Sequence, residues 1–398
     1  MDIVPEQDPI NNRDGHVVAV WQEMTLIWGG VCDNNHDVWN PAIIHCHSDG
    51  IWTARKTSGH VPLPTLYAAA EVIGDNLYVI CGISNHRESN DTYQLNLNTW
   101  SWLKLEPKGT RPLKSDSMVS WVSGKKIYIF GGAGEGTETG AWYPESLELQ
   151  YSDQIECFFN NQLVYYDCHN NSWNWPTACG RAPSPRTGHA GFHVQGWYKE
   201  TNSLVKNFRS LAYVFGGADC KELTCSNELY FLDMLVMKWE VVYPSKDSVR
   251  SEKWPTTRSS HSFTMVSPND GLLFGGSDNK QVLNDCWLLS VEDCISKAGV
   301  NGIWTRYEHH KYDGWEGHKA ILEPSSRRVW ILGGYSPWPE ITAHIRELTV
   351  SVPPLKALAL DVAAKNFEKL VPEIKALPQT DILRRAVEAK AARRHVIS

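Results

Sequence analysis

Short runs of alternating apolar residues, each ending in Gly-Gly or Cys-Gly, recur along most of this chain. The six runs are Leu26–Gly30, Tyr78–Gly82, Lys126–Gly132, Tyr213–Gly217, Leu272–Gly276 and Trp330–Gly334. Their last glycines are separated by 52, 50, 85, 59 and 58 residues. Alternation with a period of two predicts β-strands, and one strand type that recurs at such spacing predicts a repeat protein.

Other features recur in step with these runs. A short motif precedes each run, at Arg13–His16, Thr65–Ala68, Lys114–Ser117, Arg186–His189, Arg258–His261 and Trp315–His318. We expect this motif to open the innermost strand of each unit, and the glycine-pair strand to be second. Five units end in an outer-strand tryptophan: Trp52, Trp102, Trp173 or Trp175, Trp239 and Trp304. Four strands per unit resemble kelch repeats, so we predict an all-β fold, a six-bladed kelch β-propeller with a short C-terminal helical tail.

The predicted propeller extends over residues 1–352, where Pro353-Pro354 removes two ladder donors and ends the sheet. The sixth unit lacks an outer strand before this point, and we expect the N-terminal Ile3-Val4 to supply it. Two insertions, 133–161 and 196–210, lengthen units three and four. The rings of Trp102, Trp239 and Trp304 are expected between blades, because an exposed ring in every unit would favour aggregation.

The tail, residues 353–398, changes to a helical period. Apolar residues there follow i, i+3 and i+4 spacing in two groups: Leu355, Leu358, Val362 and Phe367, then Leu377, Pro378, Ile382 and Val387. Pro372 separates the two groups, and Leu377-Pro378 opens the second helix. We expect these stripes to bind another protein chain, and the alternative is a helical cap packed on the propeller.

The charge distribution and the cysteine content limit the classes of function and the location expected for this chain. The chain has 398 residues and a net charge of −7; residues 353–398 carry nine Lys/Arg and five Asp/Glu, which leaves −11 on the remainder. An acidic body argues against nucleic acid as the partner. The sequence holds no run of 18 apolar residues, so we expect no membrane span. Ten cysteines occur without a CxxC pair or a secretory signal, which favours reduced thiols, a cytoplasmic or nuclear location, and no zinc site.

The order of features resembles a group within the kelch proteins. The Ala182–His189 stretch, the long unit-three insertion and the ending Ser351–Pro354 before the helices are similar to kelch domain-containing proteins 1 and 2. These are substrate receptors of a cullin-2 RING ubiquitin ligase. The resemblance implies that the tail docks elongin B/C and cullin-2, with Leu377-Pro378 at the cullin box. The cysteine of the family's elongin box is absent here.

The same resemblance implies a pocket for C-terminal peptides that end in glycine. The family uses an arginine after the fourth glycine pair and a serine in the fifth motif. Ser259 matches the serine, but Ala218 stands at the arginine position. Ser260 replaces a tryptophan, and Ser117 replaces a lysine. The ligase role is therefore expected to carry over without the specificity for glycine.

Loops that follow the glycine pairs should gather on one face of the propeller. An aromatic-lined concavity with a few fixed donors suits peptide capture, and a terminal carboxylate favours cationic donors. The candidate peptide-binding residues are Arg258, Ser259, Lys221, Arg87, Trp142, Phe158, Tyr335 and Trp338. The alternative for Arg258 is that it braces its blade, as Arg186 would.

Two other classes of function remain open from the sequence. A kelch interaction scaffold without a ligase role explains the propeller equally well but explains the tail poorly. A kelch-type enzyme is less favoured, because the motif histidines are expected to bond to backbone between blades and no His-Tyr-Cys constellation stands out. His45 and His47 share a strand face, which is a weak hint of a metal. We expect no catalytic residues, cofactor or metal.

Overall fold

The computed structural model describes residues 13–32, 42–46, 52–199, 206–220, 223–243, 254–296, 303–307, 314–323, 329–335 and 346–348. The chain divides into two compact units, Met1–Leu348 and Thr349–Ser398. Several predictions lie outside the described residues: the strand at Ile3-Val4, the residues Lys221 and Trp338, His47, and the whole tail with both of its apolar groups. In the described part, no helix is long and apolar enough to cross a membrane.

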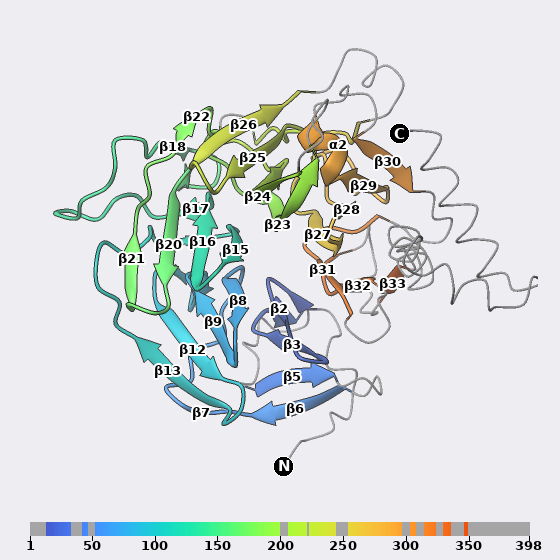
Figure 1. Cartoon of the computed structure of the whole chain (residues 1–398). Helices are drawn as coiled ribbons and strands as arrows, with labels where there is room; N and C mark the ends of the chain where they lie inside the picture. Colours follow the sequence, from blue (N-terminus) through green and yellow to red (C-terminus); the bar gives the residue numbers. More distant parts are fainter. Residues whose placement is uncertain are drawn as a thin grey trace, which may run out of the picture. The chain divides into compact units, whose positions relative to one another are not determined.

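Six antiparallel sheets, built in chain order, form six blades around a common centre (Figure 1). Blade one contains β2 (Val17–Trp21), β3 (Met24–Trp28), β5 (Ala42–Cys46) and β6 (Trp52–Lys56). Blade two contains β8 (Ala69–Ile73), β9 (Asn76–Ile80), β12 (Thr92–Asn96) and β13 (Ser101–Leu105). Blade three contains β15 (Val119–Ser123), β16 (Lys126–Phe130), β20 (Leu163–Asp167) and β21 (Ser172–Asn174).

The other three blades repeat this order. Blade four contains β23 (Ala190–Lys199), β24 (Lys206–Phe215), β25 (Leu229–Asp233) and β26 (Lys238–Val242). Blade five contains β27 (Ser262–Ser267), β28 (Asp270–Phe274), β29 (Cys286–Ser290) and β30 (Trp304–Tyr307), and blade six contains β31 (Lys319–Leu322), β32 (Val329–Leu332) and β33 (Arg346–Leu348). The predicted six-bladed propeller is confirmed, with the motif strand innermost and the glycine-pair strand second.

The packing between blades depends on the outer-strand tryptophans. Trp102, Trp239 and Trp304 are 2%, 3% and 4% exposed, so the prediction that they are buried is confirmed. The Trp102 ring lies 5.0 Å from the Trp28 ring of blade one, and the Trp239 ring lies 4.9 Å from Phe130 of blade three. Each ring therefore packs its own outer strand onto the glycine-pair strand of the preceding blade.

Backbone hydrogen bonds at the glycine pairs tie each blade to the next. The last glycine of each pair donates to a carbonyl of the following motif: Gly30 to Thr65, Gly82 to Ser115, Gly132 to Arg186, Gly217 to Arg258, Gly276 to Trp315 and Gly334 to Arg13. The bond from Gly334 to Arg13, 2.9 Å long, joins blade six to blade one. Gly334 has φ of 85°, and a Cβ there would stand 2.4 Å from the Glu316 carbonyl oxygen, so only glycine fits.

The register of the blade-three motif corrects the sequence prediction by one residue. β14 (Ser115–Asp116) pairs with β17 (Ala133–Gly134), as β1 (Arg13–Asp14) pairs with β4 (Val31–Cys32) in blade one. The motif is therefore Ser115–Met118 and not Lys114–Ser117. Met118 stands where four of the other blades have a histidine, so the sequence offered no anchor for the alignment.

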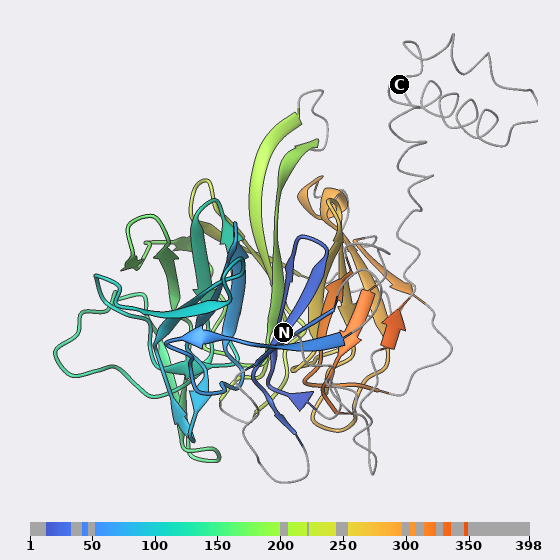
Figure 2. The same cartoon turned by 90° about the horizontal axis from the view of Figure 1, so that it is seen from below.

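Both insertions are folded, and they lie at opposite ends of the propeller. The first forms β18 (Leu149–Ser152) and β19 (Cys157–Asn160), which join β14 and β17 in a small sheet near the glycine pairs. The second extends β23 and β24 into a hairpin that projects at the other end (Figure 2).

Short segments complete the described unit. β7 (Ser58–Gly59) and β22 (Cys179–Gly180) pair in parallel with the outer strands β13 and β26. β10 (Ile83–Ser84) pairs with β11 (Arg87–Glu88), and a short helix α2 (Val291–Ser296) follows β29.

Candidate functional site at the mouth of the propeller

The glycine-pair end of the propeller has a ring of six equivalent backbone pairs, which we call the mouth. In each blade, the second motif residue pairs with the residue after the glycine pair: Asp14 with Val31, Leu66 with Ile83, Asp116 with Ala133, Thr187 with Ala218, Ser259 with Ser277, and Glu316 with Tyr335. The structure therefore brings together the six loops that the sequence predicted on one face.

The third motif residue of every blade turns sharply at the mouth. These residues have φ between 53° and 69°: Gly15, Tyr67, Ser117, Gly188, Ser260 and Gly317. Side chains other than glycine are uncommon at such angles, so Tyr67, Ser117 and Ser260 are unusual there. The Ser260 N–H donates to the Gly188 carbonyl, and the Gly317 N–H donates to the Ser260 carbonyl. This chain of bonds fixes the rim of the mouth.

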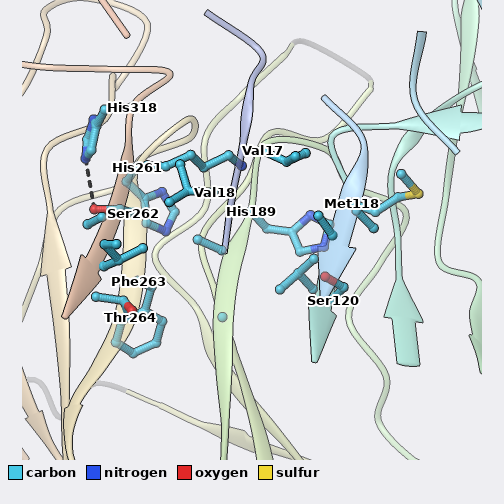
Figure 3. A pocket seen from close by; sticks show the side chains of 18 of the residues that line it. Val17, Val18, Met118, Ser120, His189, His261, Ser262, Phe263, Thr264 and His318 are labelled. Carbon is cyan, nitrogen blue, oxygen red and sulfur yellow. Dashed lines mark hydrogen bonds between the residues drawn. The ribbon is translucent and has the colours of Figure 1, made fainter. Parts of the chain in front are cut away.

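Beyond the mouth, a cavity of about 280 Å³ runs between the inner strands of all six blades (Figure 3). Small or apolar residues such as Val18 and Ala320 line most of it. Glu71 is the carboxyl group among its lining residues, and it accepts a hydrogen bond of 2.7 Å from the Ser120 hydroxyl. Burial raises the pKa of Glu71 to about 7. Lys319 lines the same cavity, so its walls carry a basic group as well as this carboxyl group.

The motif histidines are buried in their blades. His189 Nε2 lies 3.0 Å from the Phe130 carbonyl oxygen of the preceding blade, as the sequence predicted. His318 Nε2 instead lies 2.8 Å from the Ser262 hydroxyl (Figure 3). Burial lowers the pKa of both imidazoles to about 3, so they are neutral at physiological pH. In the described residues, no group of three or more His, Cys, Asp or Glu side chains is arranged to hold a metal ion.

Arg258 does not line the mouth, which corrects its assignment to the peptide site. Its side chain is fully buried, and its guanidinium binds Asp285 through two bonds of 2.7 and 2.8 Å and the Gly275 carbonyl at 2.9 Å. Arg186 binds the Gly216 carbonyl in the same way. A peptide carboxylate would have to displace Asp285 from a buried bidentate pair, so Arg258 braces blade five.

The other predicted residues are divided between the mouth and more distant positions. Ser259 and Tyr335 belong to the mouth pairs, and Ser259 Oγ accepts a hydrogen bond of 3.5 Å from the Cys225 thiol. Arg87 is exposed on β11 and lines a separate cavity of about 240 Å³ in blade two. Phe158 is half-buried in the first insertion, and Trp142 in the same insertion is 64% exposed.

Carboxylates at the mouth were not among the predicted site residues. Asp14, Asp116 and Glu316 occupy the second motif position in three of the six blades. Burial raises the pKa of all three, that of Asp116 to about 6, although the Tyr67 hydroxyl donates to Asp14 and opposes its shift. Comparing the second motif position between repeats, with blade three in its correct register, would have found them. Among the described residues, the mouth pairs therefore carry carboxylates where the resemblance had implied cations.

Comparison with known proteins agrees with this architecture. The sequence profile of the KLHDC2/KLHL20/DRC7 Kelch-repeats domain matches residues 15–199 and 150–350. The chain belongs to this kelch-repeat family. It is 27% identical to Kelch domain-containing protein 2 of Bos taurus over 321 residues, which cover 75% of this chain and 69% of that protein. The human protein of that name matches over the same length with the same identity.

The shares of the two proteins that are covered differ widely in other comparisons. Acyl-CoA-binding domain-containing protein 5 of Arabidopsis thaliana is 27% identical over 246 residues, covering 61% of this kelch chain and 32% of that protein. The solved structure titled "Structure of YjhT" superposes with a TM-score of 0.58 and 17% identity, covering 87% of this chain and 97% of the other. That similarity shows the fold alone.

Proposed function

We propose that this kelch protein is the substrate-recognition subunit of a cullin-2 RING ubiquitin ligase and is not itself catalytic. The main support is its similarity to Kelch domain-containing protein 2 over 75% of the chain. The tail, with its two apolar groups after Pro353-Pro354, is proposed to bind elongin B/C and cullin-2. Such a complex would act in the cytoplasm or the nucleus.

The mouth is the proposed site of substrate capture, with the C-terminal segment of a substrate as ligand. The six backbone pairs of its rim provide a rigid surface for a peptide. Asp14, Asp116 and Glu316 favour peptides with basic side chains near their end. Because Arg258 is bound to Asp285, a terminal carboxylate would need another cation, and Lys221, which follows the fourth glycine pair in the sequence, is the proposed partner.

Binding of purified elongin B/C to the full chain tests the ligase role. Leu355→Asp with Leu358→Asp should abolish binding, because two charges on an apolar docking face are costly to bury. Ala357→Asp with Ala364→Asp adds the same charge off the predicted stripe and should bind as the natural chain does. If the Leu355→Asp, Leu358→Asp variant still binds elongin B/C, the adaptor role is refuted. If both double variants lose binding, the loss shows only charge repulsion.

A screen of C-terminal peptides tests the mouth. Asp116→Asn with Glu316→Gln should weaken basic peptides at least tenfold, since it removes two carboxylates from the rim. Amidating the best peptide separates the contribution of the end group from that of the side chains. If no peptide binds, or if amidation has no effect, the capture of C-terminal ends is wrong.

A kelch scaffold without a ligase role is the second candidate. The stretch that matches this chain forms a minor part of some longer relatives, such as 20% of the host cell factor of Drosophila melanogaster. A propeller of this family is therefore used in more than one protein context. Failure to bind elongin B/C together with peptide binding at the mouth would favour this candidate.

A further inference from the structure

The first hairpin of blade four is much longer than those of the other blades. β23 and β24 pair over ten residues each, from Ala190↔Phe215 to Lys199↔Lys206. β25 covers β24 only from Leu211 to Phe215, and the Ser210 carbonyl accepts the last bond, 2.8 Å from the Met234 N–H. In the described structure, no strand pairs with residues 206–209 on that edge of β24. The hairpin projects beyond the other blades at this end (Figure 2).

One face of this extension is fixed to blade five. Tyr198 is 4% exposed, and its hydroxyl donates to the Pro268 carbonyl at 3.1 Å. The same ring belongs to the core cluster that contains Val291 and Cys294 of α2. Because this face is packed and hydrogen-bonded, the hairpin has a defined orientation.

The opposite face of the extension is apolar and open. Trp197 and Phe208 form a cross-strand pair with ring centroids 5.7 Å apart, yet they are 66% and 40% exposed. Exposed rings in a well-ordered ladder stabilise the hairpin little, because much of each ring stays in water. A rigid pair of exposed aromatic rings is instead typical of a protein-binding surface.

The turn between β25 and β26 adds to this surface. Leu235 and Val236 lie in that turn, 55% and 63% exposed. The bond from Met234 to Ser210 places the turn at the base of the unpaired β24 edge. We call Trp197, Phe208, Leu235 and Val236 the blade-four shelf. The shelf combines apolar side chains with backbone donors and acceptors that no described strand occupies, which is what an incoming strand requires.

Charge indicates which strand the shelf accepts. The sequence of the extension, residues 195–210, contains Lys199, Lys206 and Arg209 and one carboxylate, that of Glu200. Asp233 pairs with Arg209 at 3.0 Å, which leaves two lysines against one glutamate, a net charge of +1. A second copy of this chain would bring like charges opposite each other, which destabilises paired strands. An acidic strand is complementary.

We propose that the blade-four shelf binds an acidic, extended segment of a partner protein, which adds as a strand to the free edge of β24. Alternate residues point their backbone groups to the same side of a strand, so Phe208 presents its N–H and C=O on the side where Ser210 meets Met234. The partner's apolar side chains would contact Phe208 and Leu235. This surface is at the opposite end from the mouth and is independent of the proposed ligase role.

Fluorescence anisotropy on the full chain tests the proposal. The probe is a labelled peptide of alternating valine and glutamate, compared with a valine–lysine peptide and with a valine–glutamate peptide that has a central proline. We expect binding of the first peptide only. Trp197→Ser should weaken it at least tenfold, and Phe208→Pro should do the same by removing one edge donor.

A matched control comes from the other exposed tryptophan. Trp142, which is 64% exposed at the other end of the propeller, should tolerate Trp142→Ser without loss of peptide affinity. Equal affinity for the lysine peptide, or unchanged affinity in Trp197→Ser, overturns the proposal, and so does absence of binding. A dimer in sedimentation velocity that Phe208→Pro abolishes would assign the edge to a second copy and also overturn it.

Discussion

Replacing Arg258 distinguishes a bracing residue from a binding residue. The side chain donates to Asp285 twice, to Gly275 once, and to Thr256 through a carbonyl and a hydroxyl. Burial by itself raises the pKa of Asp285, but the hydrogen bonds and charge of Arg258 outweigh burial and lower it. The Arg258–Asp285 pair therefore stabilises the fold at pH values above the ordinary carboxyl pKa. This stabilisation is lost as the pH falls through the lowered pKa of Asp285.

Arg258→Ala should lower the free energy of unfolding by about 3–5 kcal/mol, because it leaves a mostly buried carboxylate without its cation. Trp287 Nε1 still donates to Asp285 at 2.7 Å and limits the loss to that range. Urea unfolding at pH 7 measures the change. Any peptide that binds the mouth should bind the folded variant with unchanged affinity.

A double-mutant cycle isolates the pair. Arg258→Met with Asp285→Leu removes both charges, so it should cost less than Arg258→Met alone, since replacing a whole buried pair is often nearly neutral. If Arg258→Ala costs under about 1 kcal/mol, which is the scale of an exposed ion pair, and instead weakens peptide binding, the bracing assignment is wrong.

Three further predictions concern the scaffold. Trp239→Ala should lower the free energy of chemical unfolding by about 3–5 kcal/mol, because the ring is 3% exposed and packs against Phe130. A loss under about 1 kcal/mol would show that the ring is not part of the core. The melting temperature should fall between pH 7 and pH 4, because burial lowers the pKa of His189 and of His318 to about 3, so that the unfolded chain binds more protons than the folded one in this range. His189→Gln should make the melting temperature depend less on pH, and an unchanged dependence would contradict this prediction. Deleting residues 2–8 should lower the melting temperature by several degrees, and no change would exclude strand closure by Ile3-Val4.

Local patterns in the sequence were enough to define the propeller. Alternating strands, glycine pairs and outer tryptophans are short-range signals, and each corresponds to one position in every blade. The glycines are required because the backbone of the next blade comes within contact distance, as at Gly333, where a Cβ would stand 2.2 Å from the Arg13 carbonyl oxygen of blade one. Such a requirement acts on single residues, so it is visible without a structure.

The composition of the mouth depended on tertiary structure. Arg258 and Ser259 are adjacent in sequence, yet the guanidinium turns into the blade to meet Asp285 while Ser259 stays in the rim. A one-residue shift in the blade-three motif concealed Asp116, because Met118 lacks the histidine that marks the register elsewhere. The partner of a charged side chain is set by contacts distant in sequence, and so is the electrostatic character of the site. The repeat by itself therefore determined the scaffold, and only the packing of the blades decided which charged side chains remain in the described rim of the mouth.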